Sequence, residues 1–148
     1  LGVLRVGWIV ARPDILERVR GIKDYTTASA SNLTQVFADW ALQRHEFFRR
    51  RARGIVARNR RLLGEALDRI PALHLELPDV GNVVFPHSDV DVTKLERLLI
   101  RKYRTVIAHG RFFAARGFRD HFRLGLGGKT PVFQRGLANL RRAAAELT

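Results

Sequence analysis

The chain has 148 residues, of which 46% are hydrophobic, and it carries a formal net charge of +13. This length and composition allow one domain with a buried core and exclude an intrinsically disordered chain. No apolar run reaches the roughly 18 residues that cross a bilayer, and no secretory signal is visible. The chain has no cysteine, which excludes a disulfide framework and a thiolate metal site. We expect a cytoplasmic protein.

The positive charge is concentrated in residues 44–61, a segment with eight arginines and one acidic residue, Glu46. Such a segment forms either the solvated side of a helix or a contact surface for phosphates. No nucleic-acid-binding motif accompanies it. We therefore favour the solvated helix and keep a basic nucleic-acid-binding protein as the alternative from a different functional class.

The first elements are short. Val3–Ala11 is apolar with branched residues and predicts a buried strand. Pro13 and the next residues open a helix, predicted over Ile15–Lys23 with Asp14 near its N-cap. The polar, small residues of Asp24–Ser31 predict a loop.

One long helix is predicted next. Apolar residues recur at steps of three and four from Leu33 to Ile70, which is one face of a helix capped by Ser31 or Asn32. Its length to about residue 69 would be roughly 55 Å. Gly54 and Gly64 are the expected bend or break points. A helix of this length usually connects two substructures.

The chain after Pro71 alternates short strands with helices, which predicts an α/β or α+β subdomain. The predicted strands are Leu73–Leu77, Asn82–Phe85, Thr105–Ala108 and His121–Leu126; the predicted helices run from Asp91 or Thr93 to Tyr103 and from Thr130 to about Leu147; and His109–Arg119 is a predicted loop.

Two arginines stand in apolar, strand-like runs. Arg5 lies within Leu4–Trp8 and Arg123 within His121–Gly125. A guanidinium buried in such a run is costly unless an anion pairs with it, and no acidic residue is an obvious partner for either one. A ligand with a phosphate at one end and a carboxylate at the other would satisfy both.

Other motifs give no site. The histidines are scattered without metal-ligand spacing, so we predict structural roles for them and no metal site; they are His45, His74, His87, His109 and His121. No Ser-His-Asp arrangement is arguable.

Several stretches together resemble one family. Leu1–Trp8 reads Leu-Gly-Val-Leu-Arg-Val-Gly-Trp; Lys23–Thr27 and Ser29–Gln35 precede the long apolar pattern; Gly110–Phe113 and His121–Gly125 stand near the end. In order and spacing these stretches resemble the class I/II aminotransferases, which are fold-type-I enzymes that use pyridoxal 5'-phosphate. The first stretch is similar to the one that follows the family's Schiff-base lysine, and the last two are similar to its closing motifs.

The resemblance implies an α/β fold, the C-terminal portion of a fold-type-I transferase. Residues 1–31 would finish the large cofactor-binding domain, 32–70 would form the long interdomain helix region, and 71–148 would form the small C-terminal α/β domain. By the same resemblance the whole enzyme is a homodimer of amino-acid metabolism that transfers an amino group between an amino acid and a 2-oxo acid.

The resemblance also assigns two residues. Arg5 matches the arginine that contacts the cofactor phosphate, and Arg123 matches the arginine that holds the substrate α-carboxylate. A planar guanidinium binds either anion through two parallel hydrogen bonds, which lysine cannot reproduce.

The family's Schiff-base lysine would stand about three residues before Leu1, so we expect the 148-residue chain to lack its nucleophile and to be inactive alone. Two alternatives within the fold stay open. The first is a lyase or decarboxylase that uses the same cofactor and arginines. The second is the aminotransferase-like effector domain of a transcription regulator.

Overall fold

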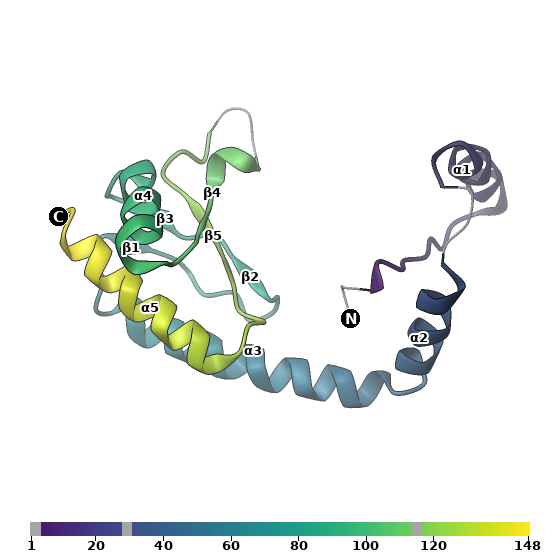
Figure 1. Cartoon of the computed structure of the whole chain (residues 1–148), viewed down its shortest axis with the longest axis horizontal. Coiled ribbons are helices and arrows are strands. Elements are labelled where there is room, and N and C mark those ends of the chain that lie inside the picture. The colour runs from purple at the N-terminus through teal and green to yellow at the C-terminus, as the bar shows by residue number, and fades with distance from the viewer. Residues whose placement is uncertain (1–3, 28–30, 114–116) are drawn as a thin grey trace. The chain divides into compact units, whose positions relative to one another are not determined.

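The structure is a computed structural model that describes residues 4–27, 31–113 and 117–148. It consists of two compact units, Leu1–Arg50 and Arg51–Thr148 (Figure 1). None of the helices in these described ranges is both long and apolar enough to cross a membrane.

The predicted strand over Val3–Ala11 is wrong for the residues that the structure describes. From Arg5 onward this segment is irregular, and its large side chains Trp8, Ile9 and Val10 are exposed, with Val10 at 91%. A strand is stable when its backbone N–H and C=O groups pair with a neighbouring strand. The strand pairs found in the described residues all lie in the second unit, so apolar character alone does not make a strand here.

Helix α1 spans Pro13–Thr26 and contains the predicted Ile15–Lys23. Its N-cap is Arg12, and Asp14 lies in the first turn, where its carboxylate is 3.3 Å from the Arg12 guanidinium. Asp14 therefore lies near the N-cap, as predicted, two positions after it. Proline fits the first turn of a helix because its missing N–H would have no partner there. Part of the predicted loop over Asp24–Ser31 is helical up to Thr26, and residues 28–30 lie outside the described ranges.

The predicted single long helix is two helices, α2 at Asn32–Leu42 and α3 at His45–Leu67. The break falls at residues 43–44, whereas Gly54 and Gly64 lie inside α3, so the predicted break points were wrong. At the break the ring nitrogen Nδ1 of His45 lies 3.0 Å from the Leu42 carbonyl oxygen, which gives that carbonyl a partner other than the helix.

Aromatic packing holds the same corner. The Trp40 and Phe48 rings meet edge to face at 5.8 Å, and the Arg44 guanidinium lies 4.7 Å from the Trp40 ring centre. Such ring pairs and cation–π contacts each contribute about 0.5–1.5 kcal/mol. They therefore offset part of the helical hydrogen bonding lost at the turn.

The second unit places two small antiparallel sheets beside helices. Its elements in chain order are β1 (Leu73–His74), β2 (Val83–Val84), β3 (His87–Ser88), α4 (Val92–Tyr103), β4 (Ala108–His109), the short 3-10 helix η2 (Gly110–Phe112), β5 (Phe122–Gly125) and α5 (Thr130–Ala145). One sheet is β1–β3 and the other is β2–β5–β4. Helix α5 runs along the C-terminal part of α3 (Figure 1).

The predicted strands and helices of this unit are confirmed in kind, although the strands are shorter than expected. The predicted loop over His109–Arg119 was wrong in part, since it contains the end of β4 and η2, and strand β3 was not predicted. Helix α4 begins where predicted, because the Asp91 carboxylate accepts the backbone N–H groups of Thr93 and Lys94 at 2.7 and 3.0 Å. The hydrogen bond from Lys94 is the main reason that the pKa of Asp91 lies below its ordinary value. At the other end Arg104 adopts a left-handed conformation that ends α4, so β4 begins three residues later than predicted.

The core of this unit lies between α3, α4, α5 and β5. Its largest fully buried side chains are Phe122, Leu63, Leu95, Leu99, Leu126 and Leu140. Phe122 and Leu126 flank the exposed Arg123, so the core and the predicted substrate arginine share one strand region. The packing of Phe122 therefore holds the backbone of Arg123 in a fixed position.

Candidate functional site

Arg123 lies in β5 and pairs with Ala108 of β4 in antiparallel register. Phe122 before it is fully buried, while the Arg123 side chain is exposed on the opposite face, as the alternation of a strand requires. The expectation of a buried guanidinium was therefore wrong, because the alternation turns this side chain out of the apolar run.

The Arg123 guanidinium is positioned by an aromatic ring. Its Cζ lies 4.7 Å from the centre of the Phe113 ring, which follows η2. Within the described part of the chain it has no hydrogen bond or ion pair with a carboxylate. Its N–H donors are thus available for an anion, and the ring restricts the plane in which they lie.

The segment that carries Phe113 is fastened to β5 by a close backbone approach. The Gly110 N–H donates to the His121 carbonyl at 2.7 Å, and a Cβ at Gly110 would lie 2.0 Å from the Phe118 carbonyl oxygen. No side chain fits at this position, so glycine is required.

His109 supports the same turn from inside the unit. Its side chain is buried, its Nδ1 accepts the Arg111 backbone N–H at 3.2 Å, and its Nε2 lies 3.3 Å from the Thr93 hydroxyl. An Nδ1 that accepts leaves the proton on Nε2, which then donates to Thr93. The turn between β4 and Phe113 is therefore connected to α4.

A pocket of about 540 Å³ opens next to Arg123. Arg104 and Arg135 also line it, together with Leu137 and Leu140 of α5. Asn139 joins α5 to the end of α4 beside the pocket, because its Nδ2 donates to the Thr105 hydroxyl at 2.9 Å and to the Tyr103 carbonyl at 3.2 Å. A lining that combines leucines with arginines suits a small organic anion.

Arg5, the second predicted site residue, belongs to the first unit and is described only within it. Its side chain is exposed and its backbone φ is 51°, in the left-handed region that non-glycine residues seldom adopt. No acidic residue pairs with it among the residues described. The expectation of burial was wrong here too.

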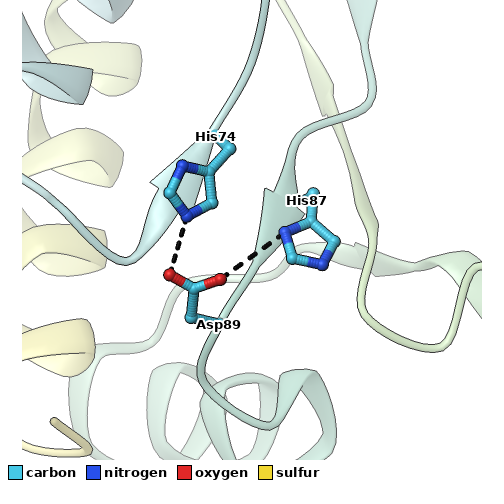
Figure 2. Close-up of side chains that lie close together, drawn as sticks. All are labelled: His74, His87 and Asp89. Atoms are coloured by element: carbon cyan, nitrogen blue, oxygen red, sulfur yellow. Dashed lines mark hydrogen bonds and ion pairs between the residues drawn. The ribbon is translucent and has the colours of Figure 1, made fainter.

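One cluster has no counterpart in the sequence predictions. His74, His87 and Asp89 point toward one another from β1 and the end of β3 (Figure 2). The sequence held a signal for part of it, since His87 and Asp89 are two residues apart, the spacing that places side chains on one face of a strand. The contribution of His74 depends on strand pairing and could not be seen from spacing.

Comparison with known proteins gives the family. The family model for aminotransferase class I and II matches residues 2–140, and the chain belongs to this family. Capreomycidine synthase from Streptomyces vinaceus is 31% identical over 138 residues, which cover 91% of this chain and 35% of that protein. The chain therefore spans about a third of the length of this relative.

Solved structures share the fold across nearly the whole chain. A pyridoxal-phosphate-dependent aminotransferase from Streptococcus suis 89-1591 superposes with a TM-score of 0.89 at 22% identity, over 98% of this chain and 38% of that one. The pyridoxal-phosphate-dependent cyclase OrfR superposes with a TM-score of 0.86 at 26% identity, over all of this chain and 41% of that one. The predicted fold class, an α/β portion of a fold-type-I enzyme, is confirmed.

Proposed function

We propose that this chain is the part of a pyridoxal-phosphate-dependent class I/II enzyme that holds an amino-acid substrate by its α-carboxylate. The observation that carries the proposal is the exposed Arg123 guanidinium, placed over Phe113 beside a pocket and without a carboxylate partner in the described residues. Two parallel N–H groups match a carboxylate in shape and charge.

The donor set of the chain also fits the cofactor. Arg5 offers an exposed guanidinium with no acidic partner among the described residues, which is the group that a phosphate dianion prefers. Arg5 would hold the cofactor phosphate and Arg123 the substrate carboxylate. When bound, the cofactor supplies an electron-withdrawing ring that stabilises negative charge at the substrate Cα.

The reaction that we propose is transfer of an amino group between an amino acid and a 2-oxo acid. The contribution of Arg123 is orientation: a bidentate contact fixes the carboxylate and with it the direction of the Cα–H bond. Lyase and decarboxylase reactions need the same contact and remain open within this proposal.

A second candidate is a ring-forming or other synthase reaction on an amino acid. It is favoured by the 31% identity to capreomycidine synthase and by the likeness to the cyclase OrfR at 26% identity. The products separate the two candidates. Transamination converts the amino acid to a 2-oxo acid and consumes a second 2-oxo acid, whereas a synthase of this kind needs no 2-oxo acid acceptor.

The domain roles are part of the proposal. Residues 1–31 would complete the large cofactor-binding domain, 32–70 would connect the domains, and 71–148 would form the small domain. The enzyme would be a cytoplasmic homodimer, and the nucleophilic lysine would stand about eight residues before Arg5. The 148-residue chain alone would then be inactive, and turnover of amino acids by the purified chain would contradict this.

The experiment begins with the coding DNA directly upstream of Leu1. A lysine codon about eight positions before Arg5 in an open frame is expected, and another residue there would argue for a binding or regulatory protein instead. The protein with this upstream part is then assayed with pyridoxal phosphate, amino acids and a 2-oxo acid, and both the 2-oxo acid and the ring-containing products are measured.

Arg123→Lys tests the carboxylate role in that protein. We expect kcat/KM to fall about 10- to 100-fold, because one bidentate, charge-assisted contact of about 1.5–3 kcal/mol is lost. The matched control is Arg101→Lys on the exposed face of α4, which should leave kcat/KM unchanged. Equal effects of the two substitutions on kcat/KM would contradict the proposed role of Arg123 in binding the substrate.

A further inference from the structure

We propose that His74, His87 and Asp89 form a binding site for a divalent transition-metal ion of the Zn²⁺ class. This site is separate from the proposed substrate site, since none of the three residues lines the pocket that Arg123 lines. All three residues belong to the second unit.

The backbone brings the three side chains together. His74 of β1 is the register partner of His87 of β3, so the two rings stand on neighbouring strands with centres 5.7 Å apart. Asp89 follows His87 by two residues. Its N–H donates to the Ala72 carbonyl at 2.9 Å, which fixes the chain beyond β3 against the start of β1.

The ligand atoms are at distances that a metal ion can bridge. His74 Nε2 lies 2.7 Å from Asp89 Oδ2, and His87 Nδ1 lies 3.7 Å from Asp89 Oδ1 (Figure 2). The three ligand atoms all lie within 4.8 Å of one another. A tetrahedral zinc ion with bonds of about 2.0–2.1 Å separates its ligand atoms by about 3.3 Å. Small side-chain rotations would therefore suffice.

The residue types select the ion. Two imidazoles and one carboxylate suit Zn²⁺ and its neighbours in the first transition row, whereas Mg²⁺ and Ca²⁺ prefer oxygen ligands throughout. Three protein ligands leave one tetrahedral position for water. Since the chain has no cysteine, no thiolate competes for the ion.

The surroundings orient His87. The His121 ring meets the His87 ring edge to face at 5.2 Å, and it stacks on Phe85 on its other side at 5.4 Å. A backbone bridge joins His87 to His121, and the Ser88 N–H donates to the Asp120 carbonyl at 2.7 Å. Neighbours that fix the ring of a ligand raise metal affinity.

The site is open to solvent, which limits the affinity but leaves access for the ion. The side chains of His74, His87 and Asp89 are 55%, 42% and 56% exposed. A bound ion would connect β1 to β3 and stabilise the folded second unit by mass action. The role is thus a structural clip across the smaller sheet.

The test is calorimetric titration of Zn²⁺ into the full 148-residue chain, freed of chelator and of any histidine tag. We expect one Zn²⁺ per chain with a Kd in the micromolar range. His74→Ala and His87→Ala should each weaken binding at least about tenfold. The matched control is His45→Ala, which removes an exposed imidazole outside the cluster and should leave the affinity unchanged.

Asp89→Asn is the second variant, since it keeps the size of the side chain and removes the charge. It should weaken Zn²⁺ binding, and Zn²⁺ should raise the unfolding midpoint of the wild-type chain but not of this variant, while Mg²⁺ raises neither. No binding at millimolar Zn²⁺, or equal affinity in the His87→Ala and His45→Ala chains, would overturn the proposal. In that case the cluster is only a pair of His–Asp contacts across β1 and β3.

Discussion

The two compact units of this chain differ in how far they bury their apolar side chains. In Arg51–Thr148 large side chains such as Leu95, Leu99 and Phe122 are completely buried. In Leu1–Arg50 the only buried residue among those described is Ala41. Trp8 and Val10 are 67% and 91% exposed.

The second unit is the part of the chain that is stabilised by its own packing. Removal of apolar surface from water is the main favourable contribution to folding, and the second unit achieves it with its own helices and strands. The first unit has apolar side chains of the same kinds without cover in its described residues. This agrees with the proposal that residues 1–31 contribute to a larger domain.

A substitution in the core of the second unit should reduce the stability of the protein most. Phe122→Ala should lower the free energy of unfolding by about 3–5 kcal/mol, because a fully buried ring is replaced by a cavity. The measurement is urea unfolding followed by far-UV circular dichroism. Trp8 and Trp40, the two tryptophans of the chain, both lie in the first unit, so tryptophan fluorescence should report that unit separately.

The matched control is Val10→Ala in the first unit. Its side chain is almost fully exposed, so the substitution should change the free energy of unfolding by less than about 0.5 kcal/mol. If Val10→Ala and Phe122→Ala had similar costs, the apolar side chains of the first unit would be covered, and the contrast between the units would fail.

The same contrast explains which parts of the fold could be predicted. In the second unit the local signals and the packing agree: Asp91 caps α4, Thr130 opens α5, and the alternation around Phe122 gives β5. In the first unit the apolar run around Trp8 predicted a strand, but a strand needs a partner that periodicity cannot show. The break before His45 was missed because it depends on a side-chain contact with the Leu42 carbonyl and not on glycine.

The candidate site was predictable where it depended on motifs and not where it depended on pairing. Arg123 was proposed from the residues around it. Phe113 stands in the Gly110–Phe113 stretch that carries the resemblance, but its contact with the Arg123 guanidinium depends on the pairing of β4 with β5 and could not be seen from the motif. The cluster of His74, His87 and Asp89 was missed because β1 and β3 are short. The sequence of one strand does not show with which residues of the other it pairs.

A second, smaller effect concerns a buried amide that joins α3 to the loop between β5 and α5. Asn59 of α3 is completely buried, and its Nδ2 donates to the carbonyls of Leu126 and Gly128 at 2.8 and 2.9 Å. Asn59→Ala would leave both carbonyls without this donor, and we expect a loss of about 1–3 kcal/mol in the free energy of unfolding.

Urea unfolding measures this loss, with Arg58→Ala as control, because Arg58 is the exposed neighbour on the same helix. A stability equal to that of the wild type would mean that water replaces the amide, and the connection between α3 and the loop before α5 would then be unimportant for the second unit.

The third prediction concerns an exposed ion pair between α4 and the end of α5, which should make a small contribution to stability that depends on pH. The Glu146 carboxylate accepts hydrogen bonds from Lys102 Nζ, at 2.7 Å, and from the Tyr103 hydroxyl. The bond from Lys102, followed by that from Tyr103, lowers the pKa of Glu146 below its ordinary 4.5. The bond to Glu146 raises the pKa of Lys102 above 10.5 and that of Tyr103 above 10.0.

Each of these pKa shifts makes the free energy of unfolding depend on pH. The lowered pKa of Glu146 contributes stability that is present above pH 4.5 and is lost as the pH falls through the folded value. The raised pKa values of Lys102 and Tyr103 contribute stability that is present below 10.5 and 10.0 and is lost as the pH rises through theirs. Glu146→Gln should therefore flatten the thermal unfolding midpoint at both ends of the pH range.

The control for this pair is Glu65→Gln, whose partner Arg61 lies 4.0 Å away on the same exposed helix face, and which should leave the pH profile unchanged. Because the Glu146 pair is solvent-exposed, salt should weaken its contribution. A wild-type profile in Glu146→Gln at low salt would show that the Glu146 contacts contribute no measurable stability beside the buried side chains of α4 and α5, such as Leu99 and Leu140. The stability of the second unit would then rest on the apolar contacts that the first unit lacks.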